Sequence, residues 1–157
     1  MESLHFEVRP FDSLTPGELY EILHLRIAVF VVEQTCIYQD LDGKDQQAMH
    51  IIGWHQGNII AYARILAPGQ QYPGHAAIGR VLTNTSFRGK GIGKQLMRFA
   101  IRTCQSTYPG PIKISAQQHL TGFYQSLGFT PAGQGYLEDG IPHIGMMYTG
   151  IDEGITP

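Results

Sequence analysis

One segment, residues 78–94, constrains the fold more than any other part of the sequence. Residues 76–82 are mostly apolar, which predicts a strand near the centre of a sheet, and residues 91–104 place apolar side chains at helical spacing. Three glycines at alternate positions lie at the junction: Gly89, Gly91 and Gly93. Glycine takes a positive φ without steric cost and lets the backbone approach a ligand closely. The segment therefore predicts a strand, a tight turn and a helix in direct succession.

This junction has the physical features of a phosphate-binding turn. The first amides of a helix have no partner within the helix, and the helix dipole adds positive potential around them. Arg88, Lys90 and Lys94 add positive charge. The Walker A spacing fails, because its first glycine is missing and Gln95 follows Lys94, and the dinucleotide spacing G-x-G-x-x-G fails as well. The spacing that fits is R-x-x-G-x-G, over residues 88–93.

The remaining elements follow from local patterns. We expect strands over residues 4–8, 49–54, 59–66, 76–82, 112–116, 129–137 and 142–149. We expect helices over residues 15–30, 91–104 and 119–127. The first helix starts at a Thr-Pro pair, and the apolar run 29–32 predicts that its end is buried. This order predicts an α/β protein with a mixed sheet, as a single domain over residues 1–157.

Two motifs, in this order, resemble those of the GNAT family of N-acetyltransferases. The R-x-x-G-x-G spacing resembles the pyrophosphate loop of that family, and Phe123–Phe129 (FYQSLGF) is similar to its FY-x-x-x-GF segment. Residues 25–34, 38–45 and 136–146 are similar to the bacterial ElaA subgroup, so the resemblance covers nearly the full chain. It implies the GNAT fold, a mixed and mostly antiparallel sheet with a splayed central strand pair and helices on both faces.

The resemblance also implies acetyl-CoA as co-substrate and a set of residues that bind it. In the family, the strand before the loop splays after a bulge, and the pantetheine arm pairs with its backbone. The amide of Leu82 would then polarise the thioester carbonyl, and Tyr124 would protonate the leaving thiolate. Gln117 stands where many relatives carry asparagine, with Gln118 or His119 as the alternative contact. The implied binding residues are Val81, Leu82, Thr83, Arg88, Gly89, Lys90, Gly91, Ile92, Gly93, Lys94, Gln117, His119 and Tyr124.

The expected acceptor is a primary amine, on a small molecule or a peptide, and its ammonium must lose a proton before it attacks. Some family members place a glutamate near the cofactor loop, but no acid occurs in residues 76–87 or 112–119. Glu33, at the end of the first helix, is our first candidate for the catalytic base. His50 and His143 follow it, and each of them is also readable as a hydrogen-bonded strand residue.

Arg26 lies on the apolar face of the first helix, and a buried arginine needs a carboxylate partner. The available carboxylates are Glu33, Asp40, Asp42 and Asp45. A structural ion pair is the favoured interpretation of this pattern. The alternative is that the acidic stretch 33–45 receives a cationic acceptor.

Composition argues against several other partners. Residues 80–113 carry seven basic residues and no acid. The formal net charge of the chain is nevertheless -2, which gives no overall polyanion-binding character, so we expect no nucleic-acid partner. No stretch approaches the roughly 18 apolar residues of a membrane span, and the N-terminal residues lack a signal pattern. Cys36 and Cys104 read as free thiols, and no metal-ligand spacing occurs, so we expect a cytoplasmic protein without a metal. A homodimer is a further expectation.

Two alternative functions stay open at this point. The first is a non-catalytic module that holds coenzyme A or acetyl-CoA without turnover. The second is a transferase for another acyl group, such as succinyl, which calls for a cation or a wider pocket near Thr83. The failed Walker and dinucleotide spacings make a nucleotide-dependent enzyme the weakest reading.

Overall fold

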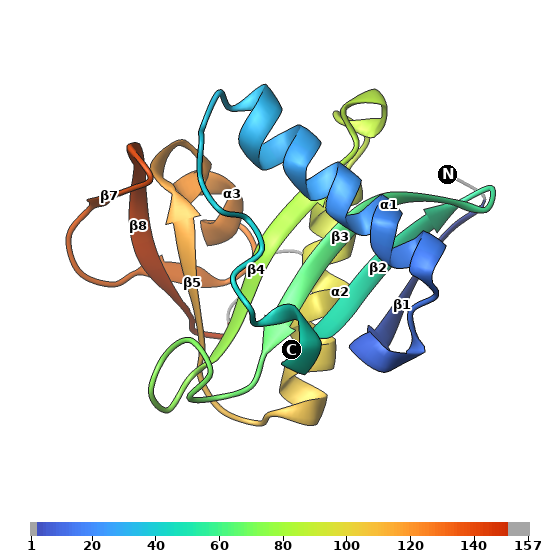
Figure 1. Cartoon of the computed structure of the whole chain (residues 1–157). Helices are drawn as coiled ribbons and strands as arrows, with labels where there is room; N and C mark the ends of the chain where they lie inside the picture. Colours follow the sequence, from blue (N-terminus) through green and yellow to red (C-terminus); the bar gives the residue numbers. More distant parts are fainter. Residues whose placement is uncertain (1–2, 151–157) are drawn as a thin grey trace.

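The computed structural model describes residues 3–150, and one eight-stranded mixed sheet organises them (Figure 1). The strands are β1 (Leu4–Pro10), β2 (Met49–His55), β3 (Asn58–Leu66), β4 (Ala76–Thr83), β5 (Ile112–Gln117), β6 (Phe129–Pro131), β7 (Tyr136–Glu138) and β8 (Ile141–Tyr148). Their order in space is β1-β2-β3-β4-β5-β8-β6, and β7 pairs with β8. Only the β4–β5 pair is parallel among these neighbours, so the predicted mixed, mostly antiparallel sheet is confirmed.

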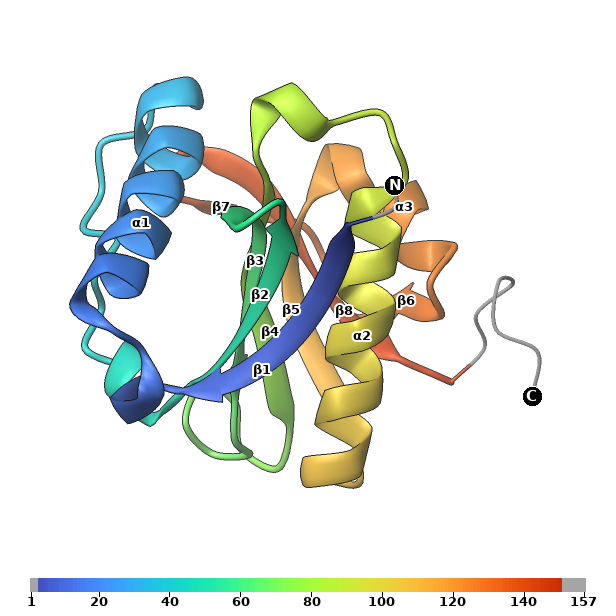
Figure 2. The ribbon, with the colours of Figure 1, turned by 90° about the vertical axis from the view of Figure 1, so that its right-hand side faces the viewer.

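Helices cover both faces of the sheet, also as predicted (Figure 2). The helix α1 (Pro16–Ile27) lies on one face, and α2 (Ile92–Thr107) and α3 (Thr121–Gln125) lie on the other. A capping box starts α1: the Thr15 hydroxyl accepts from the Glu18 amide, and the Glu18 carboxylate accepts from the Thr15 amide. Within residues 3–150, no helix is long and apolar enough to cross a membrane.

The centre of the sheet is buried on both faces. Successive side chains of a strand point to opposite faces, and Ile51 and Ile52 of β2 are both fully buried. Ile51 packs into the cluster beneath α2, which includes Leu96, whereas Ile52 packs into the cluster beneath α1, which includes Ile22. These two apolar layers fix both helices against the central strands.

The helix α1 continues as a π-helix over Ala28–Glu33, which the sequence pattern did not predict. The i→i+5 bonding of a π-helix changes the angle between successive side chains, and such turns occur often at functional sites. Val29 is buried, but Val32 is 69% exposed, so the predicted burial of the helix end holds at Val29 and not at Val32. The π-helix turns Phe30 and Glu33 toward the same cavity as Val29.

The strands β4 and β5 diverge along their length. Their only paired residues in the described chain are Ala76 with Ile112 and Ala77 with Lys113, at the start of each strand. On the other side of β4, the pairing with β3 shifts register near Arg80, which has a φ of 52°. A β-bulge bends a strand and increases its twist, so it accounts for the separation of β4 from β5. The predicted splayed strand pair is therefore confirmed.

The predicted strand over residues 129–137 is two short strands, β6 and β7, with a break at residues 132–135. Pro131 has no amide hydrogen, and the glycines Gly133 and Gly135 follow it, so continuous pairing ends there. β7 and β8 then form a tight hairpin across Asp139 and Gly140, whose φ values are 50° and 79°. Two positive φ values are typical of a type I′ turn.

Candidate active site

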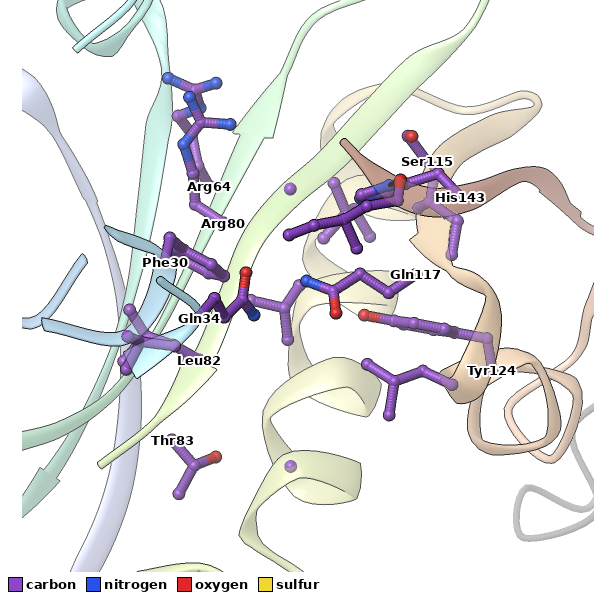
Figure 3. A pocket seen from close by; sticks show the side chains of 18 of the residues that line it. Phe30, Gln34, Arg64, Arg80, Leu82, Thr83, Ser115, Gln117, Tyr124 and His143 are labelled. Atoms are coloured by element: carbon purple, nitrogen blue, oxygen red, sulfur yellow. Dashed lines mark hydrogen bonds between the residues drawn. The ribbon is translucent and has the colours of Figure 1, made fainter. Parts of the chain in front are cut away.

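A cleft of about 1310 Å³ lies where β4 and β5 have separated. It runs from the first residues of α2 to the β7–β8 hairpin. Side chains from two walls face it (Figure 3): Phe30, Gln34, Arg80, Leu82 and Thr83 on one side, and Ser115, Gln117, Tyr124 and His143 on the other. The segments that contribute these residues are far apart in the sequence, and the divergence of the two central strands brings them around one space.

The start of α2 presents uncapped amides to this cleft. Gly91 is the N-cap residue with a φ of 78°, and no side chain caps the helix or places an acid in its first turn. Gly93 and Lys94 line the cleft beside it. Lys90 does not line the cleft; its ammonium lies 5.4 Å from the centre of the Phe87 ring. The other predicted binding residues all line the cleft, Gln117 and His119 included.

Tyr124 is only 7% exposed, and its hydroxyl extends into the cleft near the side chain of Gln117 (Figure 3). Burial raises the pKa of Tyr124 to about 12, because an ionised phenolate is poorly solvated there. The phenol is therefore fully protonated at neutral pH. A protonated hydroxyl on a cleft wall is able to donate a proton to a leaving group.

Glu33 lines the same cleft, but its carboxylate is already paired. Arg88 donates to both of its oxygens, at 2.5 and 2.8 Å, and also donates to the carbonyl oxygen of Thr83 at 3.2 Å. The hydrogen bond from Arg88 lowers the pKa of Glu33 below its ordinary value. A carboxylate held in this way is a weak proton acceptor until the ion pair opens, so a catalytic role for Glu33 stays a prediction.

The acids of the 33–45 stretch are bound to arginines. Arg26 is fully buried and donates to Asp40 at 2.9 Å and to Asp45 at 2.7 Å, which confirms the predicted structural ion pair. Arg64 donates to Asp42 and Asp45, and Arg80 donates to Asp40. Burial alone would raise the pKa of Asp45, but the hydrogen bond and charge of Arg26 outweigh it and lower that pKa. These carboxylates hold the loop in place and are not free to receive a cationic acceptor.

The two candidate histidines have different surroundings. His50 is fully buried, bonds to the Tyr62 hydroxyl at 2.6 Å and to the Asp45 carbonyl oxygen at 2.9 Å, and does not line the cleft. Burial lowers its pKa. His143 does line the cleft and lies 3.4 Å from Glu138 through its Nε2 atom. Of the two, only His143 is placed to reach a substrate.

Sequence reasoning missed Glu138, Ser115 and Tyr136. The Ser115 Oγ atom is 2.5 Å from the Tyr136 hydroxyl oxygen and 3.2 Å from the Glu138 carboxylate. The Asp139–Gly140 pair is typical of a chain reversal, but its local sequence does not indicate which strand the hairpin lies beside. Within residues 3–150, no group of three or more His, Cys, Asp and Glu side chains is arranged to hold a metal ion.

Known proteins resemble this chain along most of its length. Residues 20–149 match the family model described as "Acetyltransferase (GNAT) domain". The protein ElaA of Escherichia coli (strain K12) is 48% identical over 138 residues, which cover 86% of this chain and 90% of that protein. The crystal structure of Escherichia coli ElaA superposes with a TM-score of 0.86 and 43% identity, covering 92% of this chain and 99% of that one.

A second solved structure is equally similar. The crystal structure of an acyl-CoA N-acyltransferase from Pseudomonas aeruginosa has a TM-score of 0.88 and 41% identity, covering 94% of this chain and 100% of that one. The matched region includes β4, the glycine turn, α2 and the Tyr124 segment, which together build the cleft. From the sequence match and the shared architecture, the chain belongs to the GNAT acetyltransferase family and to its ElaA-like members.

Proposed function

We propose that this protein transfers an acetyl group from acetyl-CoA to a primary amine, by direct attack in a ternary complex. Membership of the GNAT family supports acyl transfer from an acyl-CoA. The observation that carries the finer proposal is the placement of a protonated, buried Tyr124 on the wall of a cleft whose far end is the uncapped start of α2. These two features suit the two ends of one long thioester ligand.

The diphosphate of the co-substrate would lie on the amides of residues 89–94. Gly89 and Gly91 both have positive φ, and a Cβ added at either would meet no other atom within 4 Å. The space beside the turn is therefore open, and the amides and the dipole of α2 make it favourable for an anion. Arg88 and Lys94 supply charge beside it.

The pantetheine arm would extend along the unpaired edge of β4. Val81, Leu82 and Thr83 line the cleft past the bulge, where β5 no longer pairs with β4. An arm with amide groups forms hydrogen bonds with such a strand edge as another strand does. The Leu82 amide would then steady the negative charge that develops on the thioester oxygen.

The chemical step needs one proton donor and one base. The amine lone pair forms a C–N bond with the thioester carbon, the C–S bond breaks, and the Tyr124 hydroxyl gives its proton to the leaving sulfur. The tyrosine oxygen regains a proton from the nitrogen as the amide forms. Glu33 and His143 are the candidates for the base that first deprotonates the ammonium, and Glu33 would serve only once its ion pair with Arg88 opens.

Release of free thiol from acetyl-CoA with a panel of primary amines tests this proposal. We expect amine-dependent thiol release by wild type and a loss of about 100-fold in kcat for Tyr124→Phe, which keeps the ring and removes the proton donor. Calorimetry with coenzyme A checks that the variant still binds. Equal background rates in both proteins, with intact binding, would favour a non-catalytic acyl-CoA module.

The same assay tests the acyl group. Succinyl-CoA in place of acetyl-CoA should react far more slowly, because the cation beside Thr83, Arg88, is already paired with Glu33. A succinyl rate above the acetyl rate would contradict the acetyl assignment and would leave acyl transfer itself in place.

A further inference from the structure

Four polar side chains form a cluster on the β5–β8 wall that binding of coenzyme A does not use. They are Ser115 on β5, Tyr136 and Glu138 on β7, and His143 on β8. Ser115 forms hydrogen bonds with Tyr136 and with one carboxylate oxygen of Glu138. The other carboxylate oxygen of Glu138 lies 3.4 Å from Nε2 of His143. Ser115, Glu138 and His143 all line the cleft that Tyr124 lines.

The hydrogen bond at the other ring nitrogen fixes the tautomer of neutral His143. Its Nδ1 atom is 2.7 Å from the carbonyl oxygen of Ile141, and a carbonyl oxygen only accepts. Nδ1 therefore carries the hydrogen, and Nε2 keeps a lone pair. The carboxylate of Glu138 is also only an acceptor, so two acceptors face each other at 3.4 Å. His143 is 7% exposed, so a donor that satisfies both atoms comes either from the cleft or from a proton taken up at Nε2.

The charge around this cluster favours a cationic donor. The arginines on the opposite side of this half of the cleft, Arg64 and Arg80, are matched by Asp40, Asp42 and Asp45. Glu138 bonds to none of the arginines in that network, and its side chain is 49% exposed at the cleft rim. Its negative charge is therefore available to an incoming cation.

We propose that this cluster is the acceptor site and that His143 is the catalytic base, an inference that rests on the proposed amine acetylation. The ammonium of an alkyl amine donates one N–H to Glu138 and one to Nε2 of His143. Its proton passes to Nε2, and the neutral nitrogen attacks the thioester carbon. The C–S bond then breaks, Tyr124 protonates the sulfur, and the tyrosine oxygen takes back a proton from the nitrogen. The products are one amide, one thiol and one proton on His143, which passes to solvent. The acceptor class is a primary alkyl amine that is cationic at neutral pH.

Several polar and charged groups surround His143. Tyr136 stacks on its ring at 6.3 Å with an angle of 21°, and Glu138 is the charged group that faces it from β7. From the helix side, Gln118 donates to the His143 carbonyl oxygen at 3.1 Å, and Tyr124 lies on the same wall. Other groups that titrate or carry charge also line this half of the cleft, including Cys36, Tyr38, Lys44, Tyr72 and Asp139.

The first test is thiol release with butylamine at saturating acetyl-CoA, measured as a function of pH. For His143→Gln we expect kcat/KM about 100-fold below wild type at pH 7. Its rate should then rise about tenfold per pH unit toward the pKa of the amine itself, roughly 10.4, because only free amine can react. Wild type should reach its plateau at lower pH. His24→Gln, a change at an exposed histidine of α1 that does not line the cleft, should keep the wild-type profile.

The second test measures butylamine binding to the protein–coenzyme A complex by calorimetry, without turnover. Glu138→Gln should weaken binding about tenfold. Asp139→Asn is the matched control, because it removes the same charge one residue away and asparagine tolerates the positive φ there; it should change binding less than twofold. Circular dichroism and coenzyme A binding confirm that each variant is folded.

The outcomes separate this inference from the proposed function. Wild-type pH dependence in His143→Gln, or loss of the profile in Glu33→Gln instead, would overturn His143 as the base. Equal amine affinity in wild type and Glu138→Gln would overturn the acceptor site. Amine binding that weakens as predicted, with no thiol released by wild type, would support the site and contradict acetyl transfer.

Discussion

Tyr124 shows how burial prepares a single residue for chemistry. It sits in the apolar cluster beneath α2 while its hydroxyl reaches the cleft, and its ring lies edge-on to Phe129 at 6.0 Å. Its pKa of about 12 in the folded state compares with 10.0 for an unperturbed tyrosine. The folded state therefore prefers the protonated form, and the stability that this preference gives is lost as pH rises from 10 toward 12.

Tyr124→Phe removes this pH dependence at one position. Between pH 8 and pH 11, the free energy of unfolding should fall by about 1.4 kcal/mol less in the variant than in wild type. Urea unfolding at the two pH values measures the difference. Cys104, whose pKa burial raises to about 11, stays in both proteins and makes an equal contribution. If the free energy of unfolding fell equally in wild type and Tyr124→Phe, the pKa of Tyr124 would be the same in the folded and unfolded states, which would contradict its burial.

Arg26 is the residue whose removal should cost the fold most. It is fully buried and carries the Asp40 and Asp45 bonds that hold the loop beside the cleft. Arg26→Met should lower the free energy of unfolding by about 3–5 kcal/mol, because two buried carboxylates lose a partner. Arg88→Met breaks a half-exposed pair with Glu33 and should cost about 1 kcal/mol or less. Similar losses for both variants, in urea titrations, would contradict the assigned burial.

At the scale of elements, the sequence patterns predicted the features that depend on neighbouring residues in the chain. The start of α1 at the Thr-Pro pair, the strands β2 and β3, and the glycine turn into α2 all depend on residues close in sequence. The π-helix at Ala28–Glu33 and the break between β6 and β7 were not predicted, because packing against distant strands decides them. The same holds for the Glu33–Arg88 pair, whose partners are 55 residues apart.

The start of α2 offers a change that separates folding from binding. A Cβ at Gly93 would meet the Phe123 ring at 3.6 Å, an ordinary contact, and alanine is favoured over glycine in a helix. Gly93→Ala should therefore leave the free energy of unfolding within about 1 kcal/mol of wild type or raise it. Gly93 lines the cleft beside the expected diphosphate, so a methyl group added there should lower coenzyme A affinity at least about tenfold.

Gly17→Ala is the matched control for this change. Gly17 lies in the first turn of α1, and a Cβ there meets nothing within 4 Å. Gly17→Ala should change the free energy of unfolding by about as much as Gly93→Ala does, and it should leave coenzyme A affinity unchanged. Calorimetry and urea unfolding on both variants provide the comparison, and unchanged affinity in Gly93→Ala would place the diphosphate elsewhere.

At the scale of the molecule, the cleft is a consequence of sheet geometry. A bulge at Arg80 separates β4 from β5, and the gap collects side chains from the π-helix, α2, α3 and the β7–β8 hairpin. Motifs in the sequence predicted the half of the cleft formed by β4 and α2, and they also predicted Tyr124, because a short continuous motif marks each of them. In the proposed acceptor half, His143 was a sequence candidate, but Ser115 and Glu138 were missed, because these side chains meet only through the pairing of β5, β7 and β8.

The central claim is that the start of α2 holds a diphosphate while β4 directs a thioester toward Tyr124. Calorimetry with coenzyme A and with pantetheine, which keeps the thiol arm and lacks the diphosphate, tests it most directly. We predict micromolar binding of coenzyme A and binding of pantetheine at least about 100-fold weaker, a difference of about 2.7 kcal/mol. Equal affinities, or no association of coenzyme A with the folded protein, would contradict the claim.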